Sequence, residues 1–100
     1  MEKIIEQNLS EIKQLFLKYG AERAYLFGSA VKGFKNQNSD IDFLFSFPAD
    51  MDYEIYADNY FDLLKSLEQL LNRQVDLVAE KTLQNPYLIE SINENKVQLL

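Results

Sequence analysis

Gly28-Ser29-Ala30-Val31-Lys32-Gly33 is joined through residues 34–39 to Asp40-Ile41-Asp42-Phe43-Leu44-Phe45, and this stretch decides the fold. The first segment is a small-residue turn after an apolar run, which suits the close approach of a phosphate. The second segment places two carboxylates two residues apart on a predicted strand, so both are expected to project to one face. A phosphate-binding turn beside paired carboxylates is typical of metal-dependent phosphoryl or nucleotidyl transfer.

Apolar periodicity predicts alternating helices and strands along the rest of the chain. Helical periods cover residues 2–19, 52–72 and 86–95, and strand-like runs cover residues 24–27, 41–47, 75–78 and 97–100. No linker, repeat or low-complexity tract separates them, so residues 1–100 are predicted to form one domain. The order of the elements predicts the α/β (α+β) class, a small mixed β-sheet with helices packed on it.

Glycine, serine and proline mark the expected boundaries of these elements. Gly20 stands where a glycine commonly ends a helix. Pro86 suits the first turn of the last helix, where its missing N–H costs no hydrogen bond. Ser29 is predicted as the N-cap of a helical turn that runs through Lys32 and is closed by Gly33.

The composition excludes several kinds of chemistry. The 100 residues include no Cys and no His, which removes thiol nucleophiles, zinc–thiolate sites and the commonest general base. The apolar fraction of 47% and the aromatic fraction of 13% predict a folded globule. The net charge of −6 disfavours direct binding of nucleic acid. The same charge suits a basic protein partner and a site that concentrates divalent cations.

The chain carries no targeting signal or membrane span that we recognise. Its N-terminal residues lack the apolar core of a signal peptide. No apolar run is long enough to cross a bilayer. We therefore expect a soluble, cytoplasmic protein with no membrane partner.

Asp40, Asp42 and Asp76 are the candidate catalytic and metal-binding residues. Asp42 lies between Ile41 and Phe43 in a predicted strand, where a divalent cation could offset the desolvation of its charge. Asp76 is a lone acid in another apolar run, and an adjacent strand would bring it beside the first two. From the residues alone, ordinary turn chemistry also explains Asp40 and Asp42, and a strand end facing water also explains Asp76.

Gly28, Ser29 and Lys32 are the candidate nucleotide-binding residues. Backbone N–H groups at the start of a helix attract anions, and the Ser29 hydroxyl could hold a phosphate oxygen. Lys32 lies one turn further on and could reach a phosphate. An ordinary surface lysine explains Lys32 equally well.

Together these residues match the signature of a known family. The pattern is Gly28-Ser29, ten residues, Asp40-Ile41-Asp42, and a later acid, Asp76, on the third predicted strand. The chain resembles the minimal nucleotidyltransferases of the DNA polymerase β-like superfamily, the MNT antitoxin half of bacterial HEPN–MNT toxin–antitoxin pairs. The likeness covers nearly the whole chain and implies a nucleotidyltransferase fold.

The resemblance also implies a role for each residue of the signature. Asp40, Asp42 and Asp76 would hold two Mg²⁺ ions, which Mn²⁺ is expected to replace because carboxylate sites accept both. Asp76 would also help to deprotonate the attacking hydroxyl. Gly28 and Ser29 would bind the phosphates of ATP, the nucleotide substrate.

The chain departs from the family at two positions. The family often has Arg where this sequence has Ala30 and Lys32. One cation is therefore missing, and the other is a lysine, which makes no bidentate fork to phosphate. We expect nucleotide affinity or reaction rate to be reduced.

The leading hypothesis is an antitoxin enzyme that transfers AMP from ATP to a hydroxyl, expected to be that of a tyrosine, on a cognate HEPN-family toxin. Two alternatives stay open: an antitoxin that masks the toxin by contact alone, and an enzyme that nucleotidylates a small molecule. The sequence also leaves open whether the chain forms homo- or hetero-oligomers.

We see no room in the chain for an acceptor domain, so the acceptor is expected to arrive with another protein, or the site is open to solvent. Residues 50–62 are a candidate contact, with Tyr53, Tyr56, Tyr60 and Phe61 among five acids. An amphipathic helix with a solvated acidic face is the simpler interpretation of this stretch.

Overall fold

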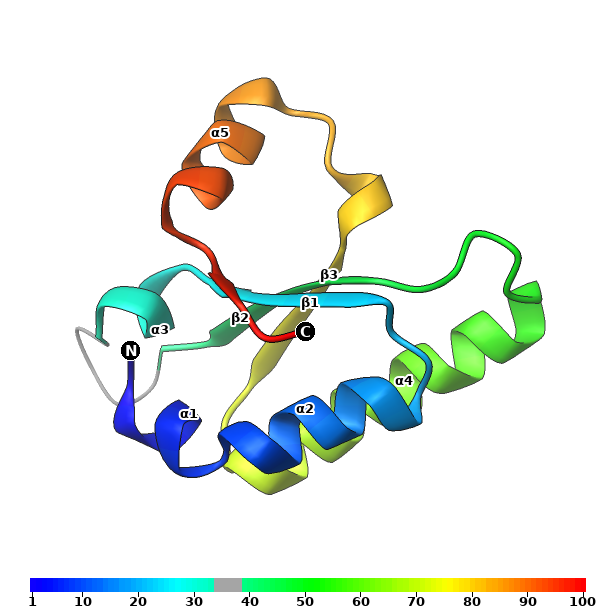
Figure 1. Cartoon of the computed structure of the whole chain (residues 1–100), viewed down its shortest axis with the longest axis horizontal. Coiled ribbons are helices and arrows are strands. Elements are labelled where there is room, and N and C mark those ends of the chain that lie inside the picture. The colour runs from blue at the N-terminus through cyan, green and yellow to red at the C-terminus, as the bar shows by residue number, and fades with distance from the viewer. Residues whose placement is uncertain (34–38) are drawn as a thin grey trace.

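A four-stranded mixed sheet forms the centre of the molecule (Figure 1). The computed structural model describes residues 1–33 and 39–100, apart from the Lys32 side chain; residues 34–38 of the predicted polar link lie outside this description. The strands are β1 (Arg23–Phe27), β2 (Ile41–Ser46), β3 (Val75–Ala79) and β4 (Val97–Gln98). Their order in the sheet is β3-β2-β1-β4.

Strand directions make the sheet mixed, as the sequence predicts. Strand β1 runs antiparallel to β2 and to β4, whereas β2 and β3 are parallel. The parallel pair needs a crossover, and the long helix α4 (Tyr53–Leu71) provides it. Strand β2 is therefore internal to the sheet, and β3 lies at its edge.

Helices cover the two faces of the sheet unequally. The helices α1 (Lys3–Gln7), α2 (Leu9–Lys18) and α4 lie along one side, and α5 (Pro86–Asn95) lies on the other (Figure 1). The short helix α3 (Ser29–Lys32) follows β1 directly. A 3₁₀ turn over Glu80–Thr82 follows β3 and was not predicted.

Strand β2 is buried on both faces. Ile41, Phe43 and Phe45 are fully buried in the core cluster shared with α2 and α4, as their alternation predicts. Leu44, on the opposite face, is also buried, with 2% of its surface exposed. Ile92 of α5 is buried as well and lines the same hollow as Leu44, so α5 covers this part of the second face.

The prediction of one helix over residues 2–19 is wrong. The helix is interrupted at Asn8, which separates α1 from α2. The Asn8 side-chain amide donates a hydrogen bond to the Ile4 carbonyl oxygen at 2.8 Å. Such side-chain bonds compete with the regular ladder of a helix, and the periodicity of apolar residues does not reveal them.

The prediction that Ser29 caps α3 is also wrong. The N-cap is Gly28, at φ 73°, and Ser29 is already the first helical residue. Gly28 is better suited to this place because a side chain is strained at that backbone conformation. Gly33 ends the helix at φ 105°, as expected.

No helix of the described residues combines the length and the apolar character that crossing a membrane requires.

Asn85 holds the start of α5, because its Oδ1 accepts hydrogen bonds from the Tyr87 and Leu88 backbone N–H groups at 2.9 and 3.3 Å. We predict that Asn85→Ala lowers the free energy of unfolding by about 1 kcal/mol and speeds amide exchange in α5. Urea denaturation and hydrogen exchange measure the two effects. Asn93→Ala, at an exposed position of the same helix, is the control and should leave stability within about 0.5 kcal/mol of the wild type. Equal losses in the two variants would show that the cap is unimportant.

Candidate active site

The parallel pairing of β2 and β3 brings two predicted carboxylates together. Asp42 and Asp76 are register partners in adjacent strands, so their side chains leave the sheet on the same face. This is the face opposite the core cluster, because Ile41, Phe43 and Leu77 point to the core. Asp42 is partly buried and Asp76 is exposed. The expectation that an adjacent strand carries Asp76 to Asp42 agrees with this register.

Asp40 lies one residue before β2 and is exposed. The expectation that both carboxylates project from one strand therefore holds for Asp42 only. The backbone around Asp40 is anchored on both sides. Arg73 donates a hydrogen bond from Nη2 to the Ser39 carbonyl oxygen, and the Ile41 N–H donates to the Gln74 carbonyl oxygen at 3.0 Å.

Gly28 packs directly against the Asp42 carboxylate. An ideal Cβ at this position would overlap Asp42 Oδ2 and would lie 3.2 Å from Asp42 Cγ. The register explains the approach, because Phe27 at the end of β1 is the partner of Asp42. The phosphate-binding turn predicted from the sequence and the predicted metal-binding acid are therefore neighbours.

The Asp42 carboxylate is affected by burial and by the two other acids. Burial raises the pKa of Asp42 to about 6, with further contributions from Asp76 and then Asp40. The field of Asp76 also reaches α4, where the pKa of the Tyr60 hydroxyl is raised first by burial and then by Asp76. A cation between these acids would remove the repulsion that they impose on one another.

These acids are the right kind of ligand for a divalent cation, but their side chains are not yet arranged around an ion. An all-carboxylate donor set is the kind that Mg²⁺ and Mn²⁺ prefer. Among the described residues, however, no group of three acidic side chains is already arranged to hold a metal ion. Asp40 and Asp76 are exposed, so their side chains are free of the packing that would prevent convergence on an ion.

A hollow of about 370 Å³ adjoins the Gly28–Ser29 turn. Its lining residues are Phe27, Gly28, Ser29, Leu88, Ser91, Ile92 and Asn95. The last four belong to α5, which was predicted as a helix but was not assigned to the site. No signal in the sequence could have placed them there, because helical periodicity does not say which strand end a helix covers.

The two positions that depart from the family differ in structure. Ala30 is fully buried in the core cluster, so a small apolar side chain occupies the position where the resemblance led us to expect Arg. Lys32 ends α3, but its side chain lies outside the described part of the structure. Its role at phosphate remains a prediction.

The nucleotidyltransferase domain family matches residues 5–99 of the chain. The chain therefore belongs to the nucleotidyltransferase domain family, and the predicted enzyme class is confirmed. A candidate protein adenylyltransferase of Methanocaldococcus jannaschii is 33% identical, over 91% of this chain and 97% of its own length.

Solved structures confirm the predicted fold. A candidate minimal nucleotidyltransferase has a TM-score of 0.78 at 28% identity, over 97% of this chain and 95% of its own. A toxin–antitoxin structure with AMP-PNP has a TM-score of 0.72 at 26% identity, over 93% and 73%. The complex of tri-AMPylated Shewanella oneidensis HEPN toxin with MNT antitoxin has a TM-score of 0.67 at 23% identity, over 95% and 71%. At that identity the likeness concerns the fold alone.

We predict that Gly28→Ala lowers stability by about 2–4 kcal/mol, because both the backbone conformation and the Asp42 carboxylate oppose a side chain. In the Asp42→Ala background the loss should fall to about 1–2 kcal/mol, since only the backbone strain remains. Urea denaturation of the four proteins in a double-mutant cycle measures the coupling.

Gly33→Ala is the matched control for this cycle. Gly33 also has a positive φ, but a Cβ there would meet no atom of the described residues within 4 Å. Its cost should therefore be about 1–2 kcal/mol with or without the Asp42 carboxylate. If Gly28→Ala cost the same in both backgrounds, the contact between Gly28 and Asp42 would be refuted.

The raised pKa of Asp42 predicts that the stability of the metal-free protein depends on pH. The pKa of Asp42 in the folded protein, about 6, lies above its ordinary value of 3.8, so the folded state holds this proton more tightly than the unfolded state. The stability from this group is complete below about pH 4 and is lost as the pH rises through about 6. After allowance for solvent screening, the loss by pH 7 should be about 1–2 kcal/mol.

Asp42→Asn should remove this part of the pH dependence and make the metal-free protein more stable than the wild type at pH 7. Thermal melts in EDTA from pH 4 to pH 8 measure the difference between the two proteins. Glu11→Gln, at an exposed position of α2, serves as the control. A constant difference across this range would contradict the raised pKa.

Proposed function

We propose that the chain is the antitoxin of a HEPN–MNT pair and that, in the cytoplasm, it transfers AMP from ATP to a tyrosine hydroxyl of the HEPN toxin. The observation that carries this proposal is the pairing of Asp42 with Asp76 across two parallel strands, with Gly28 packed against Asp42. The candidate protein adenylyltransferase among the relatives supports AMP as the transferred group. The similar toxin–antitoxin structure with AMP-PNP supports ATP as its source.

Asp40, Asp42 and Asp76 would hold two Mg²⁺ ions, or Mn²⁺ in their place. When bound, such ions stabilise the negative charge that develops on the phosphates during transfer. Three carboxylates are a suitable donor set, and Asp42 gains a partner for a charge that burial otherwise disfavours. Gly28 and Ser29 would bind the triphosphate, with Lys32 as a further phosphate ligand.

Asp76 is proposed as the base of the reaction. A tyrosine hydroxyl has a pKa of about 10, so it must lose its proton to attack well. The hydroxyl oxygen forms a bond to the α-phosphorus, the bond from that phosphorus to the bridging oxygen breaks, and pyrophosphate leaves with the electron pair. The proton passes to the exposed Asp76 carboxylate and from there to water.

The hollow between Ser29 and α5 is proposed to accept the nucleoside part of ATP. It adjoins the phosphate-binding turn and has an apolar wall that includes Phe27, Leu88 and Ile92. Ser91 and Asn95 supply polar groups at the same place. A base could stack on the apolar wall while its edge meets these polar groups.

An antitoxin that masks its toxin by contact alone is the second candidate. Two observations favour it. The acids are not already arranged around a metal position in the described residues, and residue 30 is a buried alanine where the resemblance led us to expect a cationic arginine.

We predict that limiting amounts of this protein, incubated with a HEPN-type toxin, ATP and Mg²⁺, add one or more AMP units to a toxin excess. The intact mass of the toxin measures the transfer, and loss of its ribonuclease activity should follow the mass shift. Asp42→Asn should abolish transfer, because an amide is a poor ligand for the metal. Inhibition without a mass shift, and only at equimolar protein, would refute catalysis and favour masking.

A further inference from the structure

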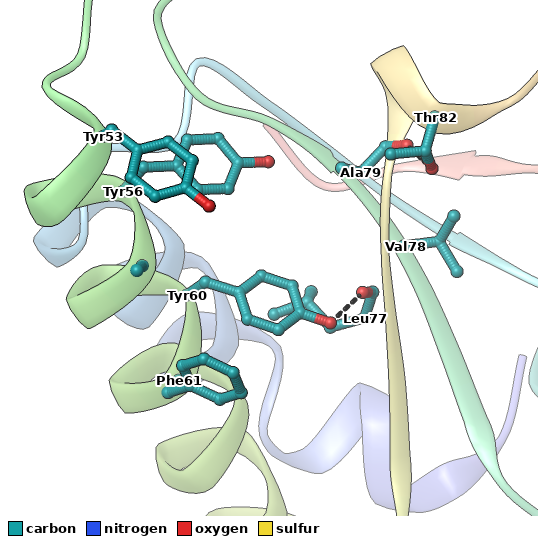
Figure 2. Close-up of a pocket in the computed structure, with 9 residues that line it drawn as sticks. Tyr53, Tyr56, Tyr60, Phe61, Leu77, Val78, Ala79 and Thr82 are labelled. Carbon is teal, nitrogen blue, oxygen red and sulfur yellow. Dashed lines mark hydrogen bonds between the residues drawn. The ribbon is translucent and has the colours of Figure 1, made fainter.

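An open aromatic groove lies along the edge of the sheet, between α4 and β3 (Figure 2). Its volume is about 470 Å³. The residues that line it are Tyr53, Tyr56, Ala57, Tyr60 and Phe61 from α4, with Leu77, Val78 and Ala79 from β3 and Thr82 beyond it. Residues 50–62 were the stretch that the sequence offered as a candidate contact, so the structure gives this stretch a defined surface.

Large aromatic side chains of the groove are exposed to solvent. Tyr53 is 87% exposed and Phe61 is 64% exposed. Tyr60 forms an edge-to-face pair with Phe61, at a centroid distance of 5.3 Å. Aromatic rings that are exposed together and held beside a hollow are typical of surfaces that bind another molecule.

Side chains already cover part of the backbone edge of β3. The Tyr60 hydroxyl donates to the Leu77 carbonyl oxygen at 2.7 Å, as Figure 2 shows, and the Thr82 hydroxyl donates to the Ala79 carbonyl oxygen at 2.7 Å. Glu68 Oε2 accepts a hydrogen bond from the Val75 N–H at 3.2 Å. An added strand would have to displace these bonds, so the groove favours an occupant that binds through its side chains.

Beyond the groove, the solvent-facing side of α4 is acidic. Successive residues of an α-helix are rotated by about 100°. The helix α4 therefore carries a row of acids, Glu54, Asp58 and Asp62, next to the row formed by Tyr53, Ala57 and Phe61. All three acids are exposed, and none forms an ion pair with a described residue. Their negative charges would attract a basic occupant and repel nucleic acid.

One aromatic ring of the groove already binds a cationic side chain of the same chain. Lys81 Nζ lies 4.2 Å from the centroid of the Tyr56 ring. A cation over a tyrosine ring gains from the negative face of the ring. An Arg or Lys side chain of a partner could therefore use the same chemistry on the exposed rings of Tyr53 and Phe61.

The groove and the proposed reaction share one strand. Asp76 and Leu77 are neighbours in β3, and Leu77 lines the groove while Asp76 points to the face that carries the candidate site. A protein seated in the groove would thus be held at the same edge strand as the carboxylate that is proposed as the base, and could reach it around that edge. Such positioning converts a collision between two molecules into a reaction within one complex.

We propose that this aromatic groove docks a basic segment of the acceptor protein, one that presents Arg or Lys side chains next to an apolar side chain. The proposal rests on the proposed function, in that it takes the acceptor to be a protein. It makes the α4–β3 edge the surface that selects the acceptor, separate from the residues that bind ATP.

Peptide binding tests the groove without any catalytic step. One probe is an amphipathic helical peptide with Leu along one face and Arg beside it, and the second probe has Glu in place of every Arg. Fluorescence anisotropy should give an affinity for the basic peptide that is at least about tenfold higher than for the acidic one. The double variant Tyr53→Ala/Phe61→Ala should lower the affinity for the basic peptide by about tenfold or more.

Tyr87→Ala is the matched control for this experiment. Tyr87 is 82% exposed in α5, on the other side of the sheet, so its removal should leave peptide affinity unchanged. Equal binding of the two peptides would overturn the proposal. An affinity that Tyr53→Ala/Phe61→Ala leaves unchanged, or that Tyr87→Ala lowers equally, would also overturn it.

Transfer kinetics separate this proposal from the proposed function. The Tyr53→Ala/Phe61→Ala variant should bind MgATP with unchanged affinity in calorimetry, while its KM for a HEPN toxin rises by about tenfold. An unchanged KM in an active enzyme would refute the docking surface alone. A wild-type protein that transfers no AMP, but binds the basic peptide through the groove, would refute the proposed function and leave the docking surface standing.

Discussion

Strand β2 is buried on both faces and yet contains the carboxylate of Asp42. The candidate site depends on this constraint, because burial disfavours an unpaired charge. Phe43 and Phe45 are fully buried on one face, and Leu44 is nearly so on the other. Asp42 is only partly buried; it lies near the beginning of the strand, where Gly28 leaves room for its side chain. The partial burial that remains disfavours its charged form. A bound cation would reverse that penalty, so the same position costs stability in the metal-free protein and suits metal-dependent chemistry.

One face of the sheet carries the main hydrophobic core, and the other carries the candidate active site. The face covered by α2 and α4 contains the main core, including Phe16, Phe43 and Leu67, all fully buried. In the described part of the chain, α5 and the 3₁₀ turn after β3 lie against the other face. Gly28 and Asp76, near strand ends, stay exposed. A site built in this way combines a rigid base with an open approach. The burial of Ile92 holds α5 in place, so the helix both completes the minor core and forms one wall of the hollow beside Ser29.

Helix α4 has three chemically different faces. Leu63, Leu67 and Leu71 point into the core. Tyr53, Tyr56, Tyr60 and Phe61 face the edge strand β3 and form the groove, and Glu54, Asp58 and Asp62 form the acidic row beside it. Tyr60 joins the first two faces, because its ring packs against Phe45 at a centroid distance of 5.8 Å while its hydroxyl caps the edge of β3. The groove is therefore built on a helix that the core holds rigidly, which favours a preformed docking surface.

Local patterns in the sequence determined most of the elements and the identity of the candidate residues. Apolar periodicity is a property of neighbouring residues, so it correctly placed α4, α5 and the three longer strands, and the spacing of Gly28, Asp42 and Asp76 was sufficient to indicate the family. Only the tertiary structure decided the rest. The register that sets Asp76 against Asp42, the seat of α5 beside Ser29, and the groove between Tyr60 and Leu77 all join residues that are distant in the chain. Such pairings depend on how whole faces are buried together, and that burial is a property of the folded molecule rather than of any local pattern.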